Sequence, residues 1–286
     1  MTDTNHDQLI TDTNKAFYAL TAAEYDKIGC GMVVEVAKTN AANILARIPG
    51  IDPAKTELMD FAAGTGLLAM LLAPRCKSVT ALDQSDAMIQ QLRNKLDAQS
   101  DANDRISNIV PVVADILDDV SSTRPLEGKK FDVIACTNAY HHISDPRRVT
   151  QVLAGYLKPG GYLAVVDLIK TERSAEFHTA PKTQEQEDGS HRHIVEFGAT
   201  PSDEHGQKHA HQGEDGHHHH HHQGHGGHAT HQHEHVIAHK GGFSDAEMDE
   251  FFSAAHLKLV NMGKSAQFVK DGKTYDNFLA IAQKPL

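Results

Sequence analysis

The chain has few cysteines, no long apolar run and no excess of basic residues, and each absence excludes a class of protein. Its three cysteines, Cys30, Cys76 and Cys136, are scattered and form no C-x-x-C pair, which argues against a disulfide scaffold and a cysteine-based zinc site. No apolar run approaches the ~20 residues of a membrane span, and the polar, acidic N-terminus is unlike a signal peptide. We therefore expect a protein of a reducing compartment, cytoplasmic or nuclear, with no membrane span.

The net charge of −11 with histidine neutral disfavours nucleic acid as a partner, because an acidic surface repels phosphate groups. The 286 residues suffice for one large domain or two small ones, and the 40% hydrophobic content suffices for a core. The chain also holds 22 histidines, most of them within residues 205–239. Because this low-complexity stretch cannot build a core, we expect a disordered insertion at about 200–240.

The insertion contains a run of imidazoles that are candidate metal ligands, since neutral imidazoles bind Zn²⁺, Ni²⁺ and Cu²⁺. The run consists of His217, His218, His219, His220, His221 and His222. A regulatory or metal-buffering role is one interpretation, and a neutral, expandable linker is the other. The pattern does not decide between them.

Residues 58–68 predict a buried strand, a tight glycine turn and the start of a helix. Gly64 and Gly66 let the backbone bend sharply and approach a ligand with no Cβ in the way. The free N–H groups of the following helix point at that ligand. The glycines also fit a dinucleotide fingerprint. Asp60 favours S-adenosylmethionine instead, because a carboxylate attracts its ammonium and sulfonium but would repel a pyrophosphate.

Two further acidic residues follow predicted strands. Asp83 ends the second strand, about 20 residues beyond the glycine turn, where a carboxylate can accept hydrogen bonds from both ribose hydroxyls. Asp115 follows the third strand, and Pro111 inside that strand predicts the edge of a sheet. Asp271-Gly272 predicts a hairpin between the last two strands. An antiparallel pair should therefore close an otherwise parallel sheet.

The glycine turn resembles motif I of the class I S-adenosylmethionine-dependent methyltransferases, an acidic residue followed by x-G-x-G-x-G, with Ala62 in place of the first glycine. Other segments resemble the small-molecule members of that family in the same order. Residues 23–26 resemble their A-x-x-Y-D segment, residues 137–146 resemble L-H-H-x-x-D, and residues 158–161 resemble the K-P-G-G turn into the fifth strand. The chain is thus similar to this family along most of its length.

The resemblance implies an α/β fold with a Rossmann-like seven-stranded mixed sheet, strand order 3-2-1-4-5-7-6, the last strand antiparallel and helices on both faces. It also implies that residues 1–50 form an N-terminal helical lid and residues 51–286 the methyltransferase domain. The implied function is transfer of a methyl group from S-adenosylmethionine to a small-molecule acceptor. The cofactor would lie at the carboxyl ends of strands 1, 2 and 4.

The resemblance also implies roles for individual residues. Tyr25 would belong to the lid over the cofactor, and Asp115 would contact the adenine amino group. The candidate cofactor-binding residues are Tyr25, Asp60, Ala62, Gly64, Gly66, Asp83, Gln84, Met88, Asp115, Ile116 and Asn138. His141 and His142 are the candidate catalytic bases, because an imidazole titrates near neutral pH. An amine or thiolate acceptor would need no base, and packing or capping roles are the alternative for both histidines.

Other functions stay open from the sequence alone. The chain could be a cofactor- or metal-binding regulatory module without turnover. It could also be an NAD-dependent oxidoreductase, which Asp60 and the closing hairpin oppose. The missing cysteine cluster argues against an arsenite-methylating enzyme. Similar family members act on quinones, sterols, carboxylates and other small metabolites, and the residues do not choose among these acceptors.

Overall fold

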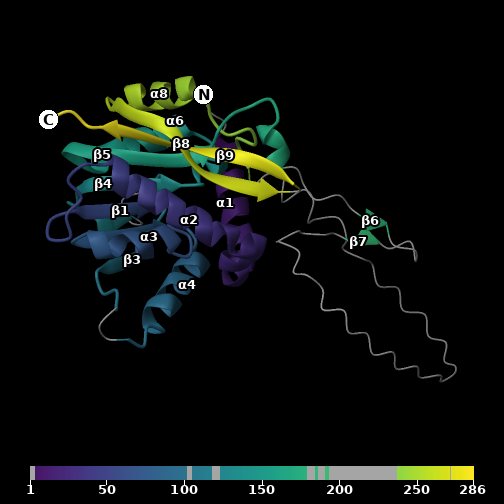
Figure 1. Ribbon diagram of the computed structural model, residues 1–286, viewed down its shortest axis with the longest axis horizontal. Coiled ribbons are helices and arrows are strands. Elements are labelled where there is room, and N and C mark those ends of the chain that lie inside the picture. The colour runs from purple at the N-terminus through teal and green to yellow at the C-terminus, as the bar shows by residue number, and fades with distance from the viewer. Residues whose placement is uncertain are drawn as a thin grey trace.

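A parallel sheet with an antiparallel end organises the chain (Figure 1). The computed structural model describes residues 4–101, 105–117, 123–178, 184–185, 191–192, 237–270 and 272–286. The strands are β1 (Glu57–Phe61), β2 (Ser78–Asp83), β3 (Ile109–Val113), β4 (Phe131–Thr137), β5 (Leu157–Leu168), β6 (Gln184–Glu185), β7 (His191–Arg192), β8 (Lys258–Lys270) and β9 (Lys273–Gln283). The α-helices are α1 (Thr4–Thr21), α2 (Ile28–Arg47), α3 (Leu67–Leu72), α4 (Asp86–Asp97), α6 (Pro146–Tyr156) and α8 (Asp245–Ala254).

The strand order of the large sheet is β3-β2-β1-β4-β5-β9-β8. Strands β1 to β5 are parallel to one another, whereas β9 is antiparallel to both β5 and β8. The expected order and the antiparallel end are therefore confirmed. Pro111 lies in β3 at the edge of the sheet, as its missing N–H donor predicts.

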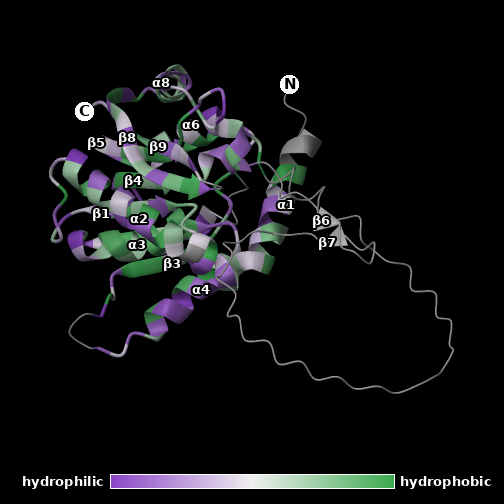
Figure 2. Ribbon diagram, turned by 45° about the vertical axis from the view of Figure 1, so that its right-hand side comes forward, coloured by the Kyte–Doolittle hydropathy of each residue, from purple (hydrophilic) through white to green (hydrophobic). Residues whose placement is uncertain are grey.

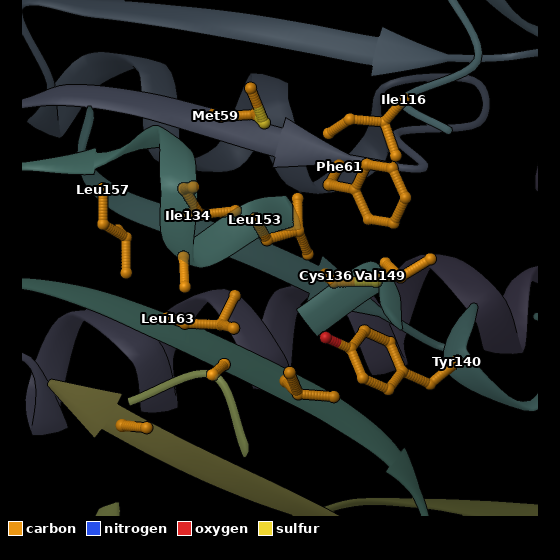
Figure 3. Close-up of a cluster of buried hydrophobic side chains, with 14 of the residues drawn as sticks. Met59, Phe61, Ile116, Ile134, Cys136, Tyr140, Val149, Leu153, Leu157 and Leu163 are labelled. Carbon is orange, nitrogen blue, oxygen red and sulfur yellow. The ribbon is translucent and has the colours of Figure 1, made fainter. Parts of the chain in front are cut away.

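Helices cover both faces of the sheet, because successive residues of a buried strand point to opposite sides. In β1, Met59 packs in the cluster that includes α6 and α8, whereas Leu58 packs in the cluster that includes α2, α3 and α4. Figure 3 shows the first cluster, where Met59, Ile134 and Leu163 come from neighbouring strands and Leu153 comes from α6. Figure 2 shows hydrophobic residues along β3 and β4 and hydrophilic residues at the projecting end of α4.

Two helices begin at side chains that cap their first turn. Ser85 Oγ accepts a hydrogen bond from the Met88 N–H at the start of α4, at 3.4 Å. Ser244 Oγ accepts one from the Glu247 N–H at 3.3 Å, and the Glu247 carboxylate accepts one from the Ser244 N–H at 2.8 Å. This reciprocal capping box satisfies two N–H groups that the helix itself leaves unpaired. Serine is a residue that helix N-termini favour for this reason.

The K-P-G-G segment corrects one expectation, because it is a bulge inside β5 and not a turn before it. Leu157 pairs with Phe131 and Tyr162 pairs with Val133, so β5 holds extra residues against β4. The glycine content explains why. A Cβ on Gly161 would lie 3.0 Å from a backbone oxygen of the neighbouring strand. Only a residue without a side chain fits this close approach.

Three short 3-10 helices contribute to the loops around the carboxyl ends of the strands: η1 (Ala22–Lys27), η4 (Tyr140–His142) and η5 (Ser174–His178). Two more, η2 (Ala73–Arg75) and η3 (Arg124–Leu126), lie in other connections. The histidine run of residues 217–222 and nearly all of the expected insertion lie outside the described residues. None of the helices in the described part of the chain is both long and apolar enough to cross a bilayer.

Substitution of Gly66 in the glycine turn tests the fold, with Gly50 as the comparison. The backbone conformation disfavours a side chain at both positions, whereas the packing disfavours one at Gly66 alone. Both have positive φ, +79° and +76°, so alanine at either position is strained by about 1 kcal/mol. A Cβ on Gly66 would also lie 2.4 Å from Leu92 of α4, whereas one on Gly50 would meet nothing within 4 Å. In urea denaturation, Gly66→Ala should lower the free energy of unfolding by roughly 1–3 kcal/mol more than Gly50→Ala. Equal losses would contradict the packing of α3 against α4.

Candidate active site

Two adjoining cavities lie at the carboxyl ends of β1, β2 and β4, where an open α/β sheet binds its ligands. The first cavity extends over residues that follow β2 and β3, and the second extends toward β5 and β9. Both cavities share a common wall. That wall consists of Tyr18, Tyr25, Ala62, Gly64, Thr137, Asn138 and His142.

The loop after β1 has a left-handed residue at every second position. Ala62, Gly64 and Gly66 have φ of 58°, 54° and 79°. Ala62 thus adopts the conformation that glycine favours, at a strain of about 1 kcal/mol. A Cβ on Gly64 would meet no atom within 4 Å, so its Cα faces open space between the two cavities. The backbone of the turn can therefore contact a ligand directly.

Asp83 joins this turn to the neighbouring strand. Its Oδ2 accepts a hydrogen bond from the Gly64 N–H and its Oδ1 one from the Ser85 N–H, both at 2.8 Å. Burial raises the pKa of Asp83, although these backbone donors oppose the shift. Each carboxylate oxygen keeps a further lone pair, and Asp83 lines the first cavity. The residue can therefore hold the turn and accept hydrogen bonds from a ligand.

The far end of the first cavity is apolar with a polar rim. Met88 is 2% exposed and Ile116 is 6% exposed, and both line the cavity. Gln84 and Asp115 supply the polar groups there, and Asp115 Oδ1 accepts a hydrogen bond from the Leu117 N–H at 2.9 Å. This combination suits a flat heterocycle with polar edges.

Two of the predicted cofactor-binding residues, Asp60 and Gly66, do not line either cavity. Asp60 is 1% exposed and accepts a hydrogen bond from the backbone of Ala69 in α3. Its Oδ2 makes no hydrogen bond to any described residue. Burial raises the pKa of Asp60 to about 8, so the carboxyl is largely protonated at neutral pH. Gly66 packs against α4 instead, as described above. Both residues support the turn from behind.

The two neighbouring histidines face different partners. His141 Nδ1 donates to Asp167 Oδ1 at 2.8 Å, and the His141 N–H donates to Asp167 Oδ2 at 3.1 Å. His142 Nε2 instead shares a hydrogen bond with the Tyr18 hydroxyl at 2.7 Å. His141 and Asp167 line the second cavity, and His142 lines both. The structure thus separates two side chains that the sequence pattern treats alike.

Asp167 is a residue that the sequence reasoning missed. It lies near the end of β5 and is fully buried. Burial alone would raise its pKa, but the His141 imidazole and the N–H groups of Leu168 and His141 outweigh this, so the pKa is lowered. The sequence does contain a feature that could have identified it, because Asp167 is an acidic residue near the end of a parallel strand, like Asp83.

Residues of the N-terminal segment close the cavities on one side. The Asn14 amide donates to the His142 carbonyl at 3.1 Å, and Tyr25 lines both cavities. Asp26 ties η1 to the glycine turn: its Oδ1 accepts a hydrogen bond from Thr65 Oγ1 at 2.5 Å, and its Oδ2 pairs with Lys95 of α4. Neither Tyr18 nor Asn14 stood out in the sequence, because their partners lie more than a hundred residues away.

Metal chemistry has no support among the side chains described. No group of three or more histidine, cysteine, aspartate or glutamate residues within the described ranges is arranged to hold a metal ion. The candidate ligands of the histidine run are not among those residues. Metal binding by that run stays a prediction.

Comparison with known proteins agrees with this geometry. Residues 59–165 match the family model of the methyltransferase domain. A stretch of 113 residues is 37% identical to an uncharacterized methyltransferase of Schizosaccharomyces pombe, covering 40% of this chain and 39% of the relative. Another stretch of 122 residues is 25% identical to a ubiquinone biosynthesis O-methyltransferase of Xanthomonas axonopodis, covering 42% and 46%. The matches thus span less than half of these curated relatives.

Solved structures share the fold over nearly the whole chain. The complex between the Haloferax volcanii Trm112 methyltransferase activator and a putative methyltransferase gives a TM-score of 0.56 at 18% identity, covering 94% of this chain and 98% of that one. The complex of DhpI with SAH gives 0.53 at 16% identity, covering 97% of each chain. At these identities the likeness concerns the fold.

Asp60 yields a pH test of the turn. The Asp60 carboxyl releases its proton near pH 4 in the unfolded chain and near pH 8 in the folded chain. The stability that the protonated carboxyl contributes is therefore fully present below about pH 4 and is lost as the pH rises toward 8. The wild-type free energy of unfolding should lose up to ~1.4 kcal/mol per pH unit between about 5 and 7 from this group, and Asp60→Asn should not. Urea denaturation of wild type and Asp60→Asn across this pH range measures the difference between their free energies of unfolding. The contributions of all other titrating groups cancel in that difference. A constant difference would contradict the buried, protonated Asp60.

Proposed function

The chain belongs to the class I S-adenosylmethionine-dependent methyltransferases, and from this we propose that it transfers a methyl group from S-adenosylmethionine to a small-molecule acceptor. The first cavity would hold the cofactor and the second the acceptor. The observation that carries this proposal is the common wall of the two cavities at Ala62, Gly64 and Asn138. Ligands in adjoining cavities meet there, which direct transfer of a group between them requires.

The residues of the first cavity fit a nucleoside. The Asp83 carboxylate would accept hydrogen bonds from the ribose hydroxyls, and Met88 and Ile116 would contact the two faces of the adenine. Asp115 and Gln84 would face its polar edge. The open space at the Gly64 Cα lets the backbone approach the ligand. When bound, S-adenosylmethionine supplies a methyl group already activated by its sulfonium.

The other residues predicted from the sequence would act through the shape of the site. Ala62 and Gly66 hold the left-handed turn, and Asp60 supports it from below. Asn138 also has a left-handed φ of 54°, and its N–H donates to the Val166 carbonyl at 2.8 Å. Tyr25 would cover the cofactor from the N-terminal side. Of these groups, Asp60 and Gly66 would serve the cofactor without lining a cavity.

The N-terminal segment would exclude water from the reaction. Tyr18 and Tyr25 lie over both cavities, and Asp26 fastens their segment to Thr65 and Lys95. A dry, positioned site is most of what an activated methyl donor needs from a protein. Residues 1–50 would therefore act as the lid, with the cofactor beneath it.

Calorimetric titration with S-adenosylmethionine, S-adenosylhomocysteine and NAD tests the proposed cofactor. Wild type should bind the two sulfur nucleosides and not NAD. Asp83→Ala should weaken their binding at least ~10-fold, because hydrogen bonds to a charged group contribute about 1.5–3 kcal/mol each. Asp86→Ala is the matched control, since Asp86 is an exposed carboxylate near Asp83 that lines neither cavity. Binding of NAD alone, or equal binding by the two variants, would overturn the assignment.

A further inference from the structure

The walls of the second cavity are aromatic and aliphatic, and they carry little charge. Phe177 and Phe268 lie on the side of β8, and their ring centroids are 5.2 Å apart. Met32 and Val33 of α2 line another part. No lysine or arginine is among the described residues of this wall, and its one carboxylate belongs to Asp167. The cavity therefore offers no cationic partner to a carboxylate or a phosphate.

The lysines behind the wall are already engaged. Lys270 Nζ donates to the Phe177 carbonyl at 2.8 Å. Lys95 Nζ donates to the Thr65 carbonyl at 2.9 Å and pairs with Asp26. Both ammonium groups thus stabilise the wall from outside. The Asp167 carboxylate is likewise used, since it accepts hydrogen bonds from His141 and from the Leu168 N–H. An ammonium group in the cavity would find no free carboxylate partner there.

A basic nitrogen of the wall, on His141, remains available to a ligand. Because the Asp167 carboxylate can only accept, the proton of His141 resides on Nδ1 and the lone pair on Nε2. His141 Nε2 makes no hydrogen bond to any other residue in the described part of the chain, and His141 lines the second cavity. His142 differs, because its Nε2 is held by Tyr18. A neutral hydrogen-bonding pair, Asn138 and Asn277, lines the same cavity.

We propose that the acceptor is an uncharged, mainly aromatic or apolar molecule with an acidic hydroxyl, a phenol or an enol, and that His141 is the base that removes its proton. This proposal deepens the proposed function and rests on it. The hydroxyl proton goes to His141 Nε2, and the acceptor oxygen forms the new O–C bond with the methyl carbon. The C–S bond breaks, and its electron pair stays on sulfur. Asp167 is the positioning residue, since it fixes the tautomer and stabilises the imidazolium.

The acceptor class is tested by binding and by turnover on a panel of phenols and naphthols with their carboxylate and alkylamine counterparts. Calorimetry on the wild-type chain saturated with S-adenosylhomocysteine measures binding, and S-adenosylhomocysteine formation measures turnover. We expect binding and methylation of the hydroxyl compounds and neither for the charged counterparts. Methylation of carboxylates or alkylamines, or no methylation of any hydroxyl compound, would overturn the acceptor class. Failure of the chain to bind S-adenosylhomocysteine would instead overturn the proposed function.

The role of His141 is tested by varying the acidity of the acceptor. A phenol with a pKa near 10, like that of tyrosine, depends strongly on a base, whereas a more acidic phenol that is still uncharged at the assay pH gives up its proton more easily. His141→Gln should lower the rate on the weakly acidic phenol by about 10²-fold or more and on the more acidic one much less. Asp167→Asn should show the same selectivity. His142→Gln is the matched control and should affect both acceptors alike.

A structural role for His141 predicts a different pattern. Equal losses on both acceptors in His141→Gln would overturn its role as base. Calorimetry with S-adenosylhomocysteine checks that each variant is folded. The variants should keep this binding, because the first cavity does not include His141 or Asp167. A variant that retains this binding is folded, so its selectivity between the two acceptors then decides the question.

Discussion

The hydrogen bonds that Asp83 accepts from Gly64 and Ser85 join the ends of β1 and β2, and the rest of the site depends on them. They hold the glycine turn open toward the cavities and begin α4 at the same point. Burying the carboxylate opposes its ionisation, and the backbone donors offset part of that cost. One side chain thus shapes the turn and faces the ligand.

Three buried carboxyl groups near the site differ in their charge state because their partners differ. Asp60 has one backbone donor and is largely protonated, so it acts as a neutral support. Asp83 has backbone donors and no cation. Asp167 has an imidazole and backbone N–H groups, which keep its pKa low. Only Asp167 is arranged to stabilise a positive charge formed nearby. Acid-base chemistry is therefore expected on the side of β5, away from the glycine turn.

The sequence predicts what local patterns determine and misses what distant contacts determine. The edge position of Pro111 and the caps at Ser85 and Ser244 follow from proline chemistry and capping rules, whereas the strand order follows from the resemblance to the methyltransferase family. The structure has all of them. The pairing of His141 with Asp167 joins η4 to the end of β5, and that of His142 with Tyr18 joins the site to α1. No local pattern separates the two histidines. The lid and the individual site residues stay predictions, supported by where the cavities lie.

A crystal structure of the chain with S-adenosylhomocysteine would test the central claim most directly, namely that two adjoining cavities divide the cofactor from the acceptor. The account predicts the nucleoside in the first cavity, with the ribose hydroxyls on Asp83 and the sulfur facing the second cavity on the side of His141. A nucleoside in the second cavity, or one bound away from Asp83, would contradict it.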